Sequence, residues 1–466
     1  MKININASYT DFYELTMSQV YFLEKRNEKA IFDYYFRNHP FEGGYTVFAG
    51  LQDALAIINN FTFPEETISY LKDCGFNSEF LKYLENFSFT GNIYAMKEGE
   101  IVFPDTPILI VEAPIIEAQI IETVLLNILN YQSLIATKAR RIRQEANDKI
   151  LIDMGFRRGH ATGALFGSKA AIIGGFDATS NVFAAKKFDL PLSGTMAHSF
   201  VQSYENEIDA FREYAKIHPN SSTFLVDTYN TLASGVPNAI QVAHEMEEKG
   251  YKLQAVRLDS GDLAYLSKQT RKMLDGSNLQ YVKIVASNQL DEWVIKSLKE
   301  QSAPIDIYGI GTNLITGKPD ASLDGVYKLS EYNGIPKMKF SDNIIKISTP
   351  CKKQVFRVFD NEEGFYGADA IALFEEEYVN KIYHPFDIRK KNDIRNKKQE
   401  RLLELVMSNK EILVKKKSIF DIAKYSEKRL SLLPLEYKRF QNPHIYKVGL
   451  SEDLKQIRDT LILKNS

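Results

Sequence analysis

Between residues 150 and 310 the chain repeats one pattern: a short apolar run, then small or polar residues, then a stretch that fits a helix. The apolar runs are Ile150–Met154, Leu190–Gly194, Thr223–Asp227, Ala255–Asp259, Val282–Ser287 and Ile305–Gly309. A strand followed by a helix, repeated several times, is typical of parallel α/β folds. The polar residues gather where the runs end, and barrels bind ligands at the carboxyl ends of their strands. The pattern therefore predicts an α/β fold and favours a barrel over an open sheet.

Composition excludes several classes of protein. Lys and Arg number 58 against 60 Asp and Glu, so a net charge of −2 gives no basic field for nucleic acid. Two cysteines cannot form a disulfide framework or a four-thiolate zinc site. No signal peptide is visible, and prolines and acids interrupt the apolar stretch 101–128 before it could span a membrane. We therefore expect a cytoplasmic enzyme with neither a membrane nor a nucleic-acid partner.

One segment, Lys381–Lys417, is strongly basic, with 12 basic and 5 acidic residues. Charge runs of this kind usually form solvated surfaces, so we expect a solvated helix and linker here. A phosphate-binding or nucleic-acid-binding surface is the alternative.

Arg257 and Asp259 lie two residues apart at the end of one apolar run. Side chains alternate along a strand, so both belong to the same face. A cation for an anionic substrate beside a carboxylate for hydroxyl groups or a metal fits such a face. The alternative is an Arg–Asp surface pair that satisfies itself, and Asp262 could instead cap the following helix.

Two further segments could bind anions. Backbone amides in the loop Gly309–Thr312 could cradle a phosphate, or its glycines could simply permit a tight turn between strand and helix. Arg157 and Arg158 offer guanidinium groups suited to phosphate or carboxylate, unless one of them forms an internal ion pair.

His198, in GTMAHS (194–199), is the most informative of the seven histidines because small residues surround it at an expected strand end. A nucleophilic or proton-shuttling histidine needs a partner that orients it, and no sequence neighbour identifies one, so a structural role is the alternative. His160 is the next candidate. The sequence contains no HExxH, no GxxxxGK[ST] and no strand-linked GxGxxG, which argues against zincin, Walker-type and dinucleotide-binding sites.

In order and spacing, the motifs resemble those of nicotinate phosphoribosyltransferases, the type II phosphoribosyltransferase family of NAD salvage. The match begins with DFYELTM (11–17) and the segment 36–51. It continues through GFRR (155–158), GGFDATSN (174–181), GTMAHSF (194–200), LVDTYNT (225–231), VRLDSGDL (256–263), ASNQLDE (286–292) and YGIGT (308–312). Each motif is short, but nine in order are specific. The last third of the chain matches only diffusely.

The resemblance implies that nicotinate and phosphoribosyl pyrophosphate give nicotinate mononucleotide and pyrophosphate, with ATP hydrolysis coupled through a phosphorylated histidine, His198. It also implies Mg²⁺, whose ligands the sequence does not identify. An arginine that binds a carboxylate favours the acid over nicotinamide. A related enzyme acting on nicotinamide or quinolinate, or a catalytically silent nucleotide-binding regulator on the same fold, are the alternatives.

The resemblance also assigns roles to individual residues. Arg257 and Asp259 join His198 as catalytic residues, and Arg257 with Thr195 lies near the nicotinate carboxylate. Asp259 faces the ribose hydroxyls, and Tyr13 stacks on the pyridine ring, in reach of a neighbouring subunit's site. The phosphate-binding residues are Arg157, Gly309, Gly311 and Thr312. In this chain Met154 replaces an aromatic residue that is common in the family, and a thioether stacks on a ring less specifically.

The fold implied by the family is an irregular α/β barrel with an additional N-terminal α/β domain that C-terminal segments complete. We expect the N-terminal domain over 1–148, the catalytic barrel over 149–326 and a segment over 327–466 that returns to both. We also expect the protein to form a homodimer with shared active sites.

Overall fold

The computed structural model describes residues 5–340, 347–360, 364–387 and 389–465. It divides into two compact units, one formed by 1–137 with 322–466 and the other by 138–321. Helix α6 (Glu122–Ala146) runs through the first boundary, so the division falls inside this helix and not after residue 148. The three predicted domain ranges themselves stay a prediction.

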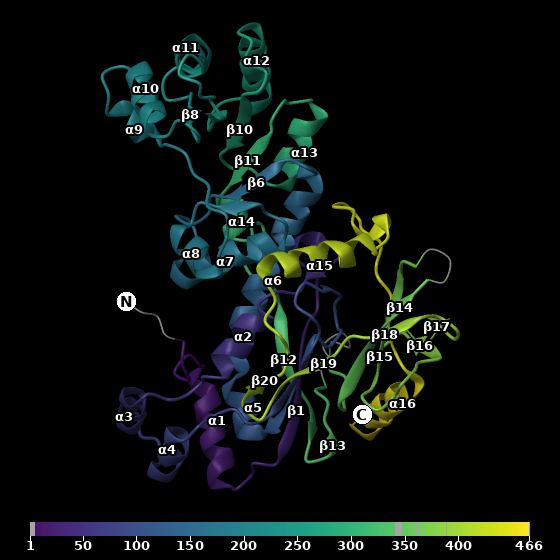
Figure 1. Cartoon of the computed structure of the whole chain (residues 1–466). Helices are drawn as coiled ribbons and strands as arrows, with labels where there is room; N and C mark the ends of the chain where they lie inside the picture. Colours follow the sequence, from purple (N-terminus) through teal and green to yellow (C-terminus); the bar gives the residue numbers. More distant parts are fainter. Residues whose placement is uncertain (1–4, 341–346, 361–363, 388, 466) are drawn as a thin grey trace. The chain divides into compact units, whose positions relative to one another are not determined.

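The unit formed by 138–321 contains a six-stranded sheet in which every ladder is parallel (Figure 1). In spatial order its strands are β7 (Ala178–Thr179), β6 (Ile150–Asp153), β11 (Ile307–Ile310), β10 (Lys283–Ser287), β9 (Ala255–Leu258) and β8 (Thr223–Leu225). Its helices are α7 (Ala161–Ile173), α8 (Val182–Phe188), α9 (His198–Gln202), α10 (Glu207–Ile217), α11 (Val236–Glu247), α12 (Leu263–Gly276), α13 (Glu292–Glu300) and α14 (Thr312–Ile315). The predicted alternation of strand and helix is confirmed.

Parallel register places the strand ends at one edge of this sheet. Val285 pairs with Arg257, and Ser287 pairs with Gly309 two residues further on. Because all strands run in the same direction, their polar ends meet there. The barrel is irregular, since its edge strands β7 and β8 share no ladder among the residues that the structure describes.

The prediction of a strand over Leu190–Gly194 is wrong. Its backbone makes a single bridge, at Leu192, to Thr179 of β7. Pro191 has no N–H to donate, and Leu192 is exposed, so neither a ladder nor burial extends the pairing. The short strand β7 takes this place in the sheet.

In the other unit, C-terminal strands complete an N-terminal sheet, as predicted. Its seven antiparallel strands are, in order, β13 (Ile335–Pro336), β12 (Gly325–Tyr332), β1 (Lys29–Phe36), β5 (Leu109–Pro114), β3 (Asn92–Ala95), β19 (Glu404–Ser408) and β20 (Glu411–Ile412). A six-stranded sheet contains β17 (Lys391–Asp393), β16 (Lys381–Tyr383), β21 (Val448–Leu450), β15 (Tyr366–Leu373), β14 (Lys353–Phe359) and β18 (Gln399–Arg401). A two-stranded ladder pairs β2 (Thr46–Val47) with β4 (Ile101–Val102). The helices are α1 (Phe12–Leu23), α2 (Leu51–Ile58), α3 (Glu65–Asp73), α4 (Ser78–Glu85), α5 (Ile115–Ile120), α6, α15 (Ile419–Ser431) and α16 (Glu452–Asn465).

The expectation of a solvated helix over the basic segment Lys381–Lys417 is wrong. Strands β16 to β20 occupy much of this segment, and two of them pair with strands of the N-terminal sheet or with each other. Several apolar residues between the charges are buried, among them Ile382, Ile394 and Met407. Burial of one face therefore outweighs the charge run as a determinant of structure.

One helical stretch, Ile115–Ala146, is long and apolar enough to cross a membrane by length and composition. The sequence predicts no such stretch, because prolines interrupt 101–128. These prolines all lie before Ile115, so they do not interrupt the helix itself. Within the structure, 67% of its apolar window is buried, as in the core helix of a folded domain. Its N-terminal part packs against α1 and β5.

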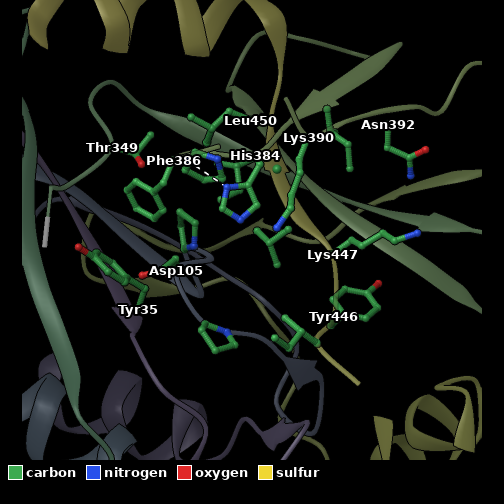
Figure 2. Close-up of a pocket in the computed structure, with 18 of the residues that line it drawn as sticks. Tyr35, Asp105, Thr349, His384, Phe386, Lys390, Asn392, Tyr446, Lys447 and Leu450 are labelled. Atoms are coloured by element: carbon green, nitrogen blue, oxygen red, sulfur yellow. Dashed lines mark hydrogen bonds between the residues drawn. The ribbon is translucent and has the colours of Figure 1, made fainter. Parts of the chain in front are cut away.

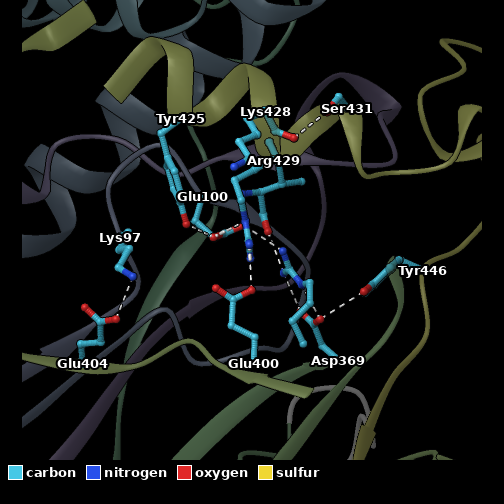
Figure 3. Close-up of polar contacts among 12 residues, drawn as sticks. Lys97, Glu100, Asp369, Glu400, Glu404, Tyr425, Lys428, Arg429, Ser431 and Tyr446 are labelled. Atoms are coloured by element: carbon cyan, nitrogen blue, oxygen red, sulfur yellow. Dashed lines mark hydrogen bonds and ion pairs between the residues drawn. The ribbon is translucent and has the colours of Figure 1, made fainter. Parts of the chain in front are cut away.

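Buried charges connect the N-terminal and C-terminal parts of this unit (Figure 3). Arg357 on β14 donates to both Asp369 oxygens, at 2.7 and 2.8 Å, and to Oε1 of Glu100 at 2.8 Å. Arg429 on α15 binds the same Glu100 and also Glu400, at 2.8 and 2.7 Å. Burial alone would lower the pKa of Arg357, but Asp369 and Glu100 raise it well above its ordinary value.

Replacement of Arg357 by Met should destabilise this unit by about 3–5 kcal/mol, because it leaves the buried Asp369 carboxylate without its cation and Glu100 with Arg429 alone. Hydrogen exchange measured by mass spectrometry should show faster exchange in β14, β15 and α15. Lys97→Met is the matched control: it breaks an ion pair to Glu404 whose side chains are 44% and 47% exposed. Such a pair contributes about 1 kcal/mol or less. Equal effects of the two substitutions would contradict this account.

Candidate active site

Arg257 lies near the end of β9 with its guanidinium group largely engaged. Nε donates to Ser287 Oγ at 2.9 Å, and Nη2 donates to Asp259 Oδ1 at 2.9 Å. Nη1 donates to Thr195 Oγ1 at 2.8 Å and to the carbonyl of Met196 at 3.3 Å. Four of its five N–H groups are therefore used, and one remains for a ligand. The network brings together Arg257, Asp259 and Thr195, whose roles at a substrate stay a prediction.

The Arg257–Asp259 pair exists, but it is not a surface pair. The two side chains are only 13% and 27% exposed. Burial would raise the pKa of the Asp259 carboxyl, but hydrogen bonds from Ser287 and Arg257 outweigh burial and hold the pKa below its ordinary value. Asp259 is thus an ionised acceptor at neutral pH, with Oδ2 not used by either of these bonds.

Asp227 follows β8 and joins two segments of the site. Its Oδ2 accepts from the Asp259 backbone N–H at 2.8 Å and from the Ser260 hydroxyl at 2.7 Å. Its Oδ1 is buried and has no hydrogen-bond partner among the described residues. A buried carboxylate oxygen without a partner is unfavourable unless a ligand or cation completes it.

His198 begins the short helix α9 and faces both carboxylates. Nδ1 lies 3.1 Å from the Thr228 hydroxyl, and Nε2 lies 3.9 Å from Asp227 Oδ1 and 3.9 Å from Asp259 Oδ2. Carboxylates near Nε2 favour the tautomer that carries the proton there, which leaves Nδ1 to accept from Thr228. The side chain is 39% exposed, so a substrate can reach the ring. The orienting partners that the sequence did not identify are therefore Thr228, Asp227 and Asp259.

Close packing explains the glycines of the predicted phosphate loop. A Cβ atom at Gly309 would lie 2.6 Å from Met154 Sδ, and one at Gly311 would lie 3.0 Å from the Met154 carbonyl oxygen. The contact at Gly311 is with backbone and leaves little room for a side chain, whereas the contact at Gly309 is with the flexible end of Met154. Thr312 begins α14 immediately after them. The phosphate-binding role of this turn stays a prediction.

The remaining candidates differ in their surroundings. Arg157 and Arg158 are exposed, and neither side chain makes an ion pair with a residue that the structure describes, so the internal-pair alternative is wrong. Tyr13 belongs to the other unit, on α1, and is 49% exposed. Burial and a hydrogen bond to Glu14 raise the pKa of Tyr13 well above its ordinary value, so it is a neutral ring.

Asp262 and His160, which the sequence offered as further candidates, lie outside the network around Arg257. Asp262 caps α12 by accepting from the Tyr265 N–H at 2.9 Å. His160 is exposed and precedes α7 without capping it. No group of three or more His, Cys, Asp or Glu side chains suited to a metal occurs among the described residues.

Sequence reasoning did not single out Asp227, Thr228 or Ser287. Each lies at or directly after a strand end, within LVDTYNT or ASNQLDE. Their position at the common edge of a parallel sheet was the available signal. Which of the polar residues there turn toward Arg257 and His198 depends on strand register, which the sequence does not state.

Known proteins resemble the chain along most of its length. The family model for the nicotinate phosphoribosyltransferase N-terminal domain matches residues 9–130, the family model itself matches 150–363, and the C-terminal domain model matches 352–458. The nicotinate phosphoribosyltransferase of Bacillus subtilis is 46% identical over 96% of this chain and 93% of its own length. That of Dictyostelium discoideum is 36% identical over 96% and 86%. The crystal structure of human nicotinic acid phosphoribosyltransferase superimposes with a TM-score of 0.88, at 29% identity over 97% of this chain and 99% of that one.

The lowered pKa of Asp259 predicts a pH dependence of stability. A carboxyl whose pKa is lower in the folded state stabilises the fold above its unfolded pKa of about 3.9, and this contribution is lost as the pH falls through the folded value. Asp259→Asn should therefore be less stable than the wild type at pH 7, and the difference should shrink as the pH falls below about 4. Trp293, the single tryptophan, lies in the same unit and reports its urea unfolding by fluorescence. A difference that stays constant down to pH 2 would contradict the assignment.

Proposed function

The chain belongs to the nicotinate phosphoribosyltransferase family, and from this premise we propose that it transfers the phosphoribosyl group of phosphoribosyl pyrophosphate to nicotinate for NAD salvage. The products are nicotinate mononucleotide and pyrophosphate, and ATP hydrolysis drives the reaction through a transient phosphohistidine at His198. One observation carries the proposal: Arg257 is hydrogen-bonded to Asp259 and Thr195, and His198 lies 3.9 Å from the carboxylates of Asp259 and Asp227.

Nicotinate recognition falls to Arg257 and Thr195. The unused N–H of Arg257 and the Thr195 hydroxyl can bind the carboxylate, because a guanidinium binds carboxylates through charged hydrogen bonds. An amide in the same place would lack the negative charge. The arrangement therefore supports the acid as the substrate over nicotinamide.

Asp259 serves the ribose. Its ionised carboxylate can accept hydrogen bonds from ribose hydroxyls and stabilise positive charge that develops at the anomeric carbon as pyrophosphate leaves. The 5′-phosphate then lies at Gly309, Gly311 and Thr312, with Arg157 as a free cation for phosphate oxygens.

His198 couples ATP to this transfer. A neutral imidazole nitrogen attacks the γ-phosphorus of ATP, the bond to the bridging oxygen breaks, and ADP leaves with its electron pair. Water later attacks the phosphorus, which releases phosphate and restores the imidazole. Thr228 and the two carboxylates hold the ring in one orientation for both steps.

Mg²⁺ fits this site because proteins bind it through one or two carboxylates together with substrate phosphates. Asp227 Oδ1, buried without a partner, and Asp259 Oδ2 would hold it. When bound, the ion would neutralise charge on phosphate oxygens.

We further propose a cytoplasmic homodimer in which Tyr13 of one subunit stacks on the pyridine ring at the partner's site. An exposed neutral tyrosine beside an exposed Phe12 supports this, because such rings commonly complete an interface.

Product analysis with nicotinate, nicotinamide and quinolinate, each with phosphoribosyl pyrophosphate, tests the substrate directly. We expect mononucleotide from nicotinate alone. Turnover of only another base would replace the proposed substrate, and nucleotide binding without any turnover would indicate a silent regulator.

His198→Ala should keep some mononucleotide formation but lose its stimulation by ATP, because the acceptor of the phosphoryl group is gone. Initial rates with and without ATP measure this. His160→Ala, at an exposed histidine outside the network, is the control and should retain full stimulation. Unchanged coupling in His198→Ala would remove the histidine from the mechanism.

Arg257→Ala should raise the nicotinate KM or reduce turnover by roughly a hundredfold or more, since charged hydrogen bonds contribute about 1.5–3 kcal/mol each. Arg257→Lys should recover little, because an ammonium cannot reproduce the forked contacts. Steady-state kinetics measure both. A wild-type KM in Arg257→Ala would exclude it from carboxylate binding.

Shared sites predict complementation between two inactive variants. Tyr13→Ala and Arg257→Ala proteins, mixed and allowed to exchange subunits, should regain activity, because one site of each mixed dimer contains both wild-type residues. Light scattering checks the dimer. No recovery in a mixture shown to contain mixed dimers would place Tyr13 outside the shared site.

A further inference from the structure

The unit formed by 1–137 and 322–466 encloses a cavity of about 950 Å³ (Figure 2). No residue of the candidate active site lines it. Its walls come from β1, from residues 384–386 and 389–392, and from the segment 443–450 that leads into α16. The volume is that of a site for a small molecule.

Cations dominate the charged lining of this cavity: Lys353, Arg389, Lys390, Lys391, Lys447 and Arg458. Two carboxylates, Asp33 and Asp105, accompany them. Lys353 is neutralised by Asp33 at 2.7 Å. Lys447 is exposed and makes no ion pair with a residue that the structure describes. The lining of this cavity thus carries an excess of positive charge, although the net charge of the whole chain is −2.

Arg458 is buried at this cavity without a close carboxylate. Its side chain is 4% exposed, yet the nearest carboxylate oxygen, on Asp459, is 4.0 Å away. Nη1 donates to the Pro385 carbonyl at 2.8 Å, but Nε is buried without a partner among the described residues. Burial lowers the pKa of Arg458, and Asp459 opposes this only in part. A buried guanidinium in this state gains strongly from an anion.

His384 supplies a second donor beside it. Nδ1 of the ring accepts from the backbone N–H groups of Phe386 and Asp387, each at 3.1 Å. The proton of the neutral ring is therefore on Nε2, which these bonds leave free to donate. The Phe386 ring lies 5.3 Å from the Arg458 guanidinium carbon and covers it.

The opposite end of the cavity differs in character. Figure 2 places Tyr35 and Asp105 at one side and Lys390, Asn392 and Lys447 at the other. Oδ1 of Asp33 is buried without a partner among the described residues and can accept a hydrogen bond. Apolar side chains, among them Ile371 and Leu450, line the space as well. A ligand that fits has an anionic end, a ring and hydrogen-bond donors.

We propose that this cavity binds a small phosphate monoester that carries a ring and hydroxyl or amino groups, such as a nucleoside monophosphate. The phosphate lies at Arg458 and His384, with Lys447 at the exposed side. The ring packs on the apolar lining, and the donors face Asp33.

Isothermal titration calorimetry of the full chain with adenosine 5′-monophosphate tests the site. Wild type should show a saturable binding event that Arg257→Ala retains, since Arg257 belongs to the other unit. Adenosine should bind at least about tenfold more weakly because it lacks the charged hydrogen bonds. Loss of all binding in Arg257→Ala, equal affinity for adenosine, or no saturable binding would each overturn the proposal.

Substitutions assign the binding event to the cavity. Arg458→Met, which keeps the length of the stem, should weaken binding at least about tenfold. Lys447→Met should weaken it roughly threefold, as expected for an exposed charge. Lys416→Met is the matched control, an exposed lysine of the basic segment outside the cavity lining, and should bind as wild type does.

If Arg458→Met fails to fold, the double variant Lys391→Met/Lys447→Met carries the test, because both side chains are exposed. Roughly tenfold weakening in this variant supports the site. Wild-type affinity there, or equal weakening by Lys416→Met, overturns it.

Discussion

The unit formed by both ends of the chain depends on a few fully buried charges. Arg357 on β14 joins Asp369 on β15 to Glu100, which lies more than 250 positions earlier in the sequence. Arg429 brings α15 to the same Glu100. A buried carboxylate without its cation is strongly unfavourable, so the C-terminal segments can only be placed where these contacts form. Strands β12 and β19 then complete a sheet that β1, β3 and β5 begin.

The candidate active site also contains partly buried charges, but the protein does not satisfy all of them. Its charges are hydrogen-bonded, but Asp227 Oδ1 and one N–H of Arg257 are left over. Groups of this kind favour a ligand that completes them, whereas the charge of the fully buried Arg357 is balanced inside the protein by Asp369 and Glu100. Preorganised donors and acceptors that need no rearrangement stabilise developing charge most effectively. The proposed binding of polyanionic substrates at this site therefore needs no high net charge on the chain.

Local charge and total charge are accordingly independent in this protein. A net charge of −2 coexists with Arg257 and Arg157 at one sheet edge and with Arg458 and Lys447 around a cavity in the other unit. The basic segment illustrates the difference between composition and placement. Its cations Lys390 and Lys391 line the cavity, whereas its apolar residues Ile382 and Ile394 anchor it in a sheet.

The parallel α/β character of 150–310 could be predicted from the sequence, because the alternation of apolar runs and helical stretches is local. Arg257, Asp259 and His198 could be proposed as site residues, since polar residues at strand ends and the family motifs are visible in the linear sequence. The strand at Leu190–Gly194 was predicted wrongly because its pairing depends on Thr179, a neighbour in space only. The contacts of Asp227 and Thr228 with His198, the packing of Gly311 against the Met154 carbonyl, and the unpaired Nε of Arg458 at a cavity appear only in the tertiary structure. These features depend on strand register and on contacts between distant segments, and neither leaves a periodic signal in the chain.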